Sequence, residues 1–104
     1  MPTHHSLAPS PTTVHWGYWD ASVPPVLHIK SGDTVTVTSV SGDFSRMPED
    51  RALVRPEHLE IVENLKPQIG AHVLTGPIWV EGAEVGDTLE VKILDIELAD
   101  SWGH

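Results

Sequence analysis

The chain has 104 residues, and 6 Lys or Arg against 15 Asp or Glu give it a formal net charge of −9 at pH 7. Such a charge repels phosphate backbones and anionic membranes, which argues against nucleic acid and membrane partners. Cysteine is absent, no apolar run approaches the roughly 18 residues of a membrane span, and no secretory signal pattern opens the chain, so we expect a cytoplasmic protein without disulfides or thiolate chemistry.

Residues 1–13 are rich in Pro, Ser and Thr and nearly lack large apolar side chains, which predicts a flexible N-terminal arm or a strap. Residues 14–104 are expected to form one β-rich domain. Within it, the alternation in "VLHIK" predicts a strand around residues 27–30. The turn "SGD" and the alternating "TVTVT" that follow predict a second strand, and together the two strands predict a hairpin.

Residues 41–55 are polar and contain Gly and Pro, which indicates a long surface loop. The next segment, 56–66, is the one convincing helix, because Pro56 suits a first turn and apolar residues recur at helical spacing before Pro67. This pattern places His58 on the solvent face of the helix.

The stretch from His72 to Gly82 is predicted to be extended, and "AEVGD" is predicted to turn into a long strand at residues 88–98. The alternation in that strand changes phase at Ile93–Leu94, so we expect a β-bulge there or burial on both faces. The resulting fold class is mostly β, a β-sandwich or barrel-like domain with one short helix near residues 56–66.

Gly-Asp-Thr opens two of the predicted strands, at residues 32–34 and 86–88. Gly permits a positive φ angle, Asp can bind the turn backbone, and Thr favours a strand, so turn chemistry is a sufficient explanation. Duplication of a β unit is the alternative.

The chain has seven histidines, which are common metal ligands, but their spacing matches no metal motif. His72 and His15 are the best candidates for a functional site, because each lies where an irregular segment enters a strand. A hydrogen-bonded structural role is the alternative for both. The remaining histidines are expected mainly at the surface.

Trp19 and Asp20 stand beside two prolines and could line a pocket, although core packing is the alternative for the aromatic residue. Three carboxylates follow within the predicted turn region, at Glu81, Glu84 and Asp87. One of them could act as a general base if its environment raised its pKa. Solvation or capping of backbone amides is the alternative, and Glu81, at the end of a strand, is the strongest candidate of the three.

Three stretches of the chain carry a family resemblance: "TGPIWVEGAEVGDTLEVKILDI", "PPVLHIKSGDTVTV" and the closing "DSWG". Together they resemble the N-terminal part of the acetamidase/formamidase family. The resemblance implies a largely β architecture and hydrolysis of carbon–nitrogen bonds in small linear amides such as formamide and acetamide, or in cyclic amides such as γ-lactams. It also implies a divalent metal, zinc in some members, whose ligands the sequence does not identify. On this basis we assign His72 and Glu81 as catalytic residues and Trp19 and Asp20 as substrate-binding residues.

Members of that family are much longer, so we expect the chain to be an N-terminal fragment with weak activity or none by itself. Open strand edges in a fragment favour association, either as a homo-oligomer or with the missing C-terminal portion. The alternative function is a noncatalytic β-sandwich module for binding or assembly.

Overall fold

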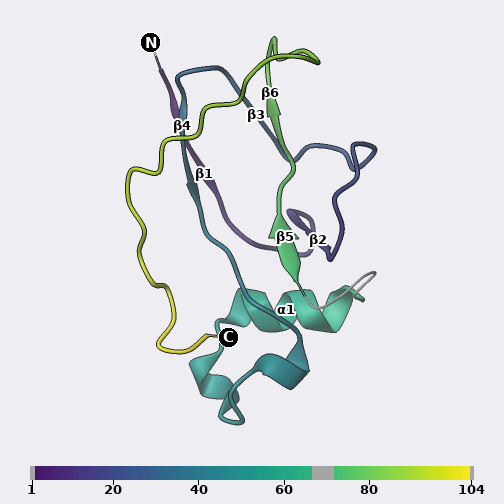
Figure 1. Ribbon diagram of the computed structural model, residues 1–104. Helices are drawn as coiled ribbons and strands as arrows, with labels where there is room; N and C mark the ends of the chain where they lie inside the picture. The colour runs from purple at the N-terminus through teal and green to yellow at the C-terminus, as the bar shows by residue number, and fades with distance from the viewer. Residues whose placement is uncertain (1, 67–71, 104) are drawn as a thin grey trace.

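The computed structural model describes residues 2–66 and 72–103 (Figure 1). It contains six short strands, one α-helix and two 3-10 turns. In chain order these are β1 (His4–Leu7), β2 (Val14–Trp16), β3 (Leu27–Ile29), β4 (Thr34–Val37), η1 (Phe44–Arg46), η2 (Arg51–Leu53), α1 (Pro56–Asn64), β5 (Val73–Thr75) and β6 (Ile78–Val80).

The strands pair into three two-stranded sheets within the described ranges. β1 pairs with β4 and β3 pairs with β6, both in parallel, while β2 and β5 are antiparallel. Strands with one helix were expected, but the described residues form neither a closed barrel nor a clear sandwich. The molecule is a small mixed domain, and the expectation of a sandwich or barrel is corrected accordingly.

The predicted hairpin of β3 with β4 is wrong. The tight turn itself is present, with the Asp33 N–H donating to the Lys30 carbonyl and Gly32 at φ +91°. The carboxylate of Asp33, however, accepts hydrogen bonds from the Thr3 N–H and from Nε2 of His5, both at 2.9 Å. These contacts place β1 beside β4, so part of the predicted N-terminal arm is a strap, and β3 pairs with β6 instead.

The main core lies between the β2–β5 pair and α1 (Figure 1). The helix begins at the predicted Pro56 and ends at Asn64, and Ile61 on its inner face is completely buried beneath Trp16 and Val73. The buried members of this cluster are Val14, Trp16, Val40, Ile61 and Val73. None of the helices in the described part of the chain has the length and hydrophobicity needed to span a bilayer.

His58 was expected on the solvent face of α1 and is instead 1% exposed. Its Nε2 donates to the Gly42 carbonyl at 2.9 Å, and its ring stacks on Trp102 with a centroid distance of 5.9 Å. The reason is non-local: the 41–55 loop and the C-terminal residues fold over this side of the helix, which therefore has no free solvent face there.

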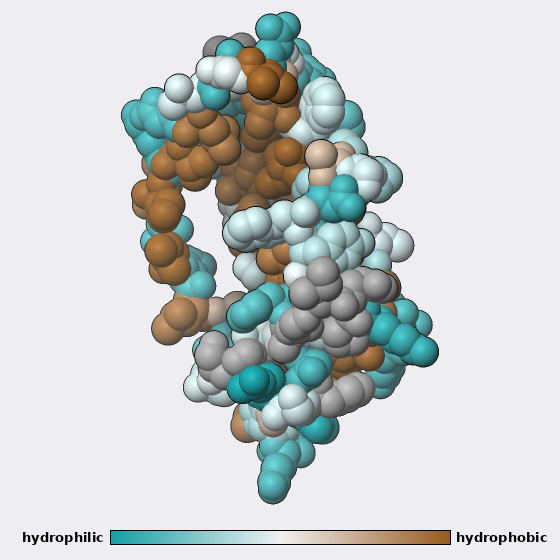
Figure 2. All heavy atoms as spheres, turned by 45° about the vertical axis from the view of Figure 1, so that its right-hand side comes forward, coloured by the Kyte–Doolittle hydropathy of each residue, from teal (hydrophilic) through white to brown (hydrophobic). Residues whose placement is uncertain are grey.

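Residues 88–98 were predicted to form a strand, but they pair with no strand in the described part of the chain. We call them the open segment. Figure 2 shows the segment as a largely hydrophobic row separated from the rest of the molecule by open space. The strand prediction is wrong for this structure because no neighbouring strand supplies hydrogen bonds or covers either face.

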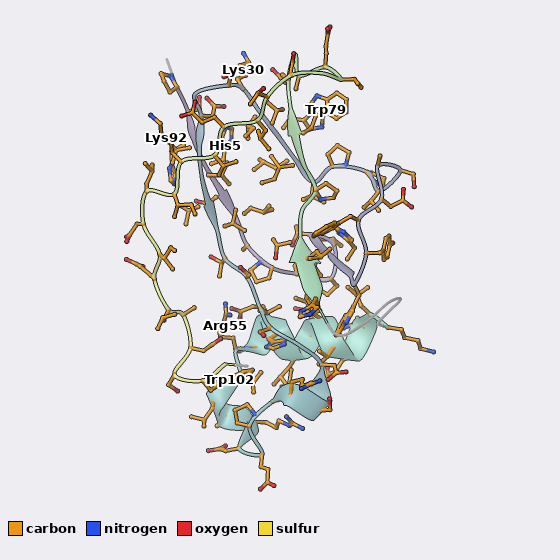
Figure 3. The ribbon with its side chains drawn as sticks, in the orientation of Figure 1. His5, Lys30, Arg55, Trp79, Lys92 and Trp102 are labelled. Carbon is orange, nitrogen blue, oxygen red and sulfur yellow. The ribbon has the colours of Figure 1, made fainter. Side chains whose placement is uncertain are left out.

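The open segment is followed by an anchored stretch, residues 100–102, which lies beside α1 (Figure 3). The Asp100 carboxylate accepts two hydrogen bonds from the Arg55 guanidinium, each 3.0 Å long. Nε1 of Trp102 donates to the Leu53 carbonyl at 3.0 Å. The chain therefore returns to the body after leaving it.

Candidate functional site

A concavity with a volume of about 590 Å³ lies beside the β2–β5 pair. Segments from four parts of the chain contribute to its wall, because β2, the loop after it, β4 and β5 converge there. The lining residues are His15, Trp19, Asp20, Ala21, Val37, Ser39, Val73, Leu74, Thr75 and Pro77. A smaller concavity of about 310 Å³ is lined by Gly17, Tyr18, Trp19, His72 and Leu74, so Trp19 borders both.

His15 is the histidine in the wall of the larger concavity. Its Nε2 lies 2.9 Å from the Tyr18 carbonyl oxygen, which can only accept, so Nε2 carries the proton. In the neutral ring Nδ1 is then an acceptor, and it is shielded from solvent without a partner in the described structure. His15 can therefore accept one further hydrogen bond.

Thr75 contributes a second polar atom that is shielded from solvent and has no partner in the described structure. It lies in β5 at the register position opposite Val14, next to the pair formed by His15 and Leu74. Its hydroxyl is shielded and has no partner within the described residues. A buried hydroxyl without a partner destabilises the fold, so this hydroxyl has a hydrogen bond to gain.

Trp19 and Asp20 occupy the loop after β2 that forms the rim of the larger concavity. Trp19 is 92% exposed and is therefore not a core aromatic, whereas Trp16 is. Oδ1 of Asp20 accepts from the backbone N–H and the hydroxyl of Ser22, at 2.8 and 2.7 Å. These two bonds lower the pKa of the exposed Asp20 carboxyl, so it is an anionic acceptor near neutral pH and a poor proton donor.

The two residues assigned to catalysis are separated. His72 is exposed and lines the smaller concavity beside Trp19. Glu81 lies in the turn after β6, exposed, and lines neither concavity. Since β5 and β6 run in succession between them (Figure 1), the structure does not bring the two side chains to one point. Glu84 and Asp87 belong to the following exposed turn, where Oδ2 of Asp87 accepts from the Glu84 N–H at 2.9 Å.

The comparison with family models matches residues 4–104 to "Acetamidase/Formamidase family". The chain belongs to the acetamidase/formamidase family. It is similar to a formamidase of Methylophilus methylotrophus, with 29% identity over 87 residues that cover 82% of this chain and 20% of that protein. A second relative, whose formamidase name is provisional, is from Schizosaccharomyces pombe, with 25% identity over 88 residues, 83% of this chain and 20% of the relative.

The chain thus spans about a fifth of the length of the acetamidase/formamidase relatives that it matches. No solved structure matches it significantly. The resemblance inferred from the sequence is confirmed at the level of the family.

A divalent metal, which family resemblance implies, does not fit the described residues. Within the described ranges no three His, Asp or Glu side chains gather in a way that could hold an ion. His15 has one nitrogen committed to Tyr18, and Asp20 has one oxygen committed to Ser22. A metal site in the family member would therefore need ligands from outside these residues.

Thr75 was not identified from the sequence, and nothing local to "VLTGP" distinguishes its hydroxyl from that of any strand threonine. Its significance arises from the antiparallel pairing of β5 with β2, which joins positions about sixty residues apart. That pairing also places His15 and Trp19 on the same concavity as Thr75.

Proposed function

We propose that this chain supplies one wall of the substrate site of an amide hydrolase acting on carbon–nitrogen bonds of small linear or cyclic amides, such as formamide, acetamide or a γ-lactam. The observation that carries the proposal is the family match over residues 4–104. Because the chain spans about a fifth of its relatives, we expect it to have little or no activity by itself.

The larger concavity offers one of the polar groups that a small amide requires. An amide presents one carbonyl acceptor and, when unsubstituted, two N–H donors. The Thr75 hydroxyl can donate to the carbonyl. His15 pairs with Leu74, one position along from the Val14–Thr75 pair, so its side chain leaves the opposite face of the β2–β5 pair and is not assigned to the same amide. The exposed ring of Trp19 would cover the apolar part of the substrate.

Thr75→Val tests this binding mode. We expect amide affinity to fall by about 2- to 12-fold, the equivalent of one hydrogen bond, while the free energy of unfolding is unchanged or higher because an unpartnered buried hydroxyl is replaced by an isosteric methyl. The measurement is an NMR titration of formamide and acetamide into the 104-residue chain. Thr36→Val, an exposed hydroxyl on β4 outside the concavity, is the control, and equal losses in both variants would contradict the assignment.

His72 is proposed as the proton-transferring side chain of the complete site, from its exposed position beside Trp19. The test is a chimera in which this chain replaces the matching fifth of the Methylophilus formamidase. His72→Ala should lower ammonia release from formamide by about 100-fold or more, the usual contribution of a general acid or base. His28→Ala, an exposed histidine on β3, should retain the parent rate. A catalytic role for Glu81 stays a prediction that the same assay can address with Glu81→Gln.

A noncatalytic binding or assembly module is the second candidate. The separation of His72 from Glu81 favours it, as does the lack of a metal-ligand cluster among the described residues. A chimera that folds but releases no ammonia, together with a titration in which the amides shift no resonance of the larger concavity, would replace the hydrolase proposal with this one.

A further inference from the structure

The open segment, residues 88–98, has the composition of a strand and the exposure of a loop. Its large apolar side chains point in both phases of the alternation and are all mostly exposed. They are Leu89 at 75%, Val91 at 71%, Ile93 at 75%, Leu94 at 74%, Ile96 at 76% and Leu98 at 92%. Six such side chains in eleven residues are far more than scattered surface hydrophobics, and contiguous apolar surface of this kind marks an interaction site.

The open segment follows a closed turn and is held by the body on its C-terminal side. Before it, the Asp87 N–H donates to the Glu84 carbonyl at 3.0 Å and Oδ2 of Asp87 accepts from the Glu84 N–H, which closes the preceding turn. After it, Asp100 is bound by Arg55 and Trp102 is stacked on His58. An extended backbone that follows a closed turn, is unpaired along its length and is anchored on its C-terminal side is a template for β-strand pairing.

The occupant of this template must cover two faces. In a strand, neighbouring side chains point to opposite sides, and apolar residues occupy both sides here because the alternation shifts at Ile93–Leu94. One short peptide strand would pair with the backbone but leave at least one apolar face in water. A larger folded polypeptide, which brings a strand and a covering layer, fits the segment better.

Charge argues against a second copy of this chain as that occupant. Residues 88–98 contain Glu90, Asp95 and Glu97 against Lys92, a net charge of 1 − 3 = −2, within a chain of net charge −9. Two copies would therefore bring like charges together. By contrast, the relatives carry about four-fifths of their length outside the part that this chain matches.

We propose that residues 88–98 become a paired β-strand when they dock against polypeptide of the kind that acetamidase/formamidase relatives carry outside the matched fifth. The open segment is then an assembly surface, and the gap visible in Figure 2 is the place of the docked layer. The inference depends on the family assignment but not on hydrolysis, so a test of it needs no activity.

Hydrogen exchange of the open segment tests the proposal, measured in the free 104-residue chain and in the chimera with the Methylophilus formamidase described above. Amides of residues 88–98 should exchange at nearly unprotected rates in the free chain. In the chimera their exchange should be slower by a factor of at least about 100. As a second arrangement, the tagged chain is co-expressed with the formamidase lacking its matching fifth, and 1:1 co-purification is expected.

Val91→Pro removes a backbone donor from the centre of the open segment. It should leave the thermal unfolding of the free chain unchanged, because residue 91 is exposed and unpaired there, and it should abolish the protection and the co-purification. The matched control is Val85→Pro. Val85 is also exposed, at 106% against 71% for Val91, but it precedes Gly86 at φ +99° in the Glu84–Asp87 turn, a position that accepts proline, so protection should persist.

Three results would overturn the proposal. Protection of residues 88–98 in the free chain that rises with concentration, together with a dimer in sedimentation, would identify a second copy as the occupant. Unprotected amides in a folded chimera would show that nothing docks there. Failure of both the chimera and the co-expressed pair to give a soluble complex would also count against it, since docking is expected to bury the apolar surface that favours aggregation.

Discussion

Asp33 lies in the turn after β3 and is the acceptor for three donors from three places in the chain. The Thr3 N–H, the Lys30 N–H and Nε2 of His5 all lie 2.9 Å from its carboxylate oxygens. These bonds, in that order of importance, lower its pKa to about 2, against a smaller opposing effect of burial. The same turn chemistry recurs at Asp87, so the Asp of both Gly-Asp-Thr repeats binds its turn backbone as the sequence predicts, although only the first repeat opens a strand in the described residues.

The depressed pKa of Asp33 gives a pH dependence with a definite sign. Its carboxylate is bound more tightly in the folded state, so the stabilisation is complete above about pH 4 and is lost as the pH falls toward about 2. Asp33→Asn should lower the melting temperature at pH 7 and flatten the acid limb of the stability curve. Melting curves from pH 7 to pH 2 check this, with Asp87→Asn as the control, whose Oδ2 binds only within its own turn. Parallel acid limbs for Asp33→Asn and the parent would contradict it.

At the scale of single residues, the sequence was informative where the chemistry is local. Asp in a turn and Pro at a helix start were predicted correctly because their partners lie within a few positions. His58 was misplaced because its burial depends on Gly42 and Trp102, which are distant in the chain. Thr75 was missed for the same reason.

Among elements, η2, Arg55 and α1 all bind residues 100–102 and tie the C-terminal part to the body (Figure 3). Arg55 and Asp100 have side chains only 18% and 17% exposed, and Nη2 of Arg55 also donates to the Ser39 carbonyl at 2.6 Å. The Arg55–Glu57 contact is longer, at 3.7 Å, and Glu57 is 38% exposed. Only the first pair is expected to stabilise the molecule appreciably.

Asp100→Asn should therefore destabilise the anchored stretch by roughly 1.5–3 kcal/mol, the usual contribution of hydrogen bonds to a charged group. Glu57→Gln should change the free energy of unfolding by about 0–1 kcal/mol, as exposed ion pairs do. Urea unfolding measures both, and the fluorescence of Trp102 reports release from His58. Equal effects of the two substitutions would show that the bidentate pair with Asp100 is not the anchor.

The elements themselves were easier to predict than their partners. The helix, the turn at residues 30–33 and the extended stretches around β3 to β6 follow from periodicity and turn residues. The pairing of β3 with β6 and of β4 with β1 does not, because alternation defines a strand without specifying its neighbour. The open segment is the extreme case, since its pattern is that of a strand and no strand of the described residues pairs with it.

For the whole molecule, the distribution of apolar side chains matters more than their number. Burying a Val, Leu or Ile side chain stabilises a fold by about 1.5–3 kcal/mol. The six apolar side chains of the open segment thus represent roughly 9–18 kcal/mol of unrealised burial, comparable with the entire stability of a typical domain, about 5–15 kcal/mol. A chain with this balance is expected to gain most of its stability through association.

The long-range strand pairings also determine when the protein can fold during synthesis. Leu27 of β3 meets Ile78 of β6, which follows it by 78 − 27 = 51 positions, and Trp16 of β2 meets Val73 of β5. Closing such large loops carries an entropic cost before any contact repays it, and folding is correspondingly slow. On the ribosome, β2 and β3 must wait in water until β5 and β6 emerge from the exit tunnel, so a nascent chain stalled before residue 73 would expose Trp16 to chaperones and proteases.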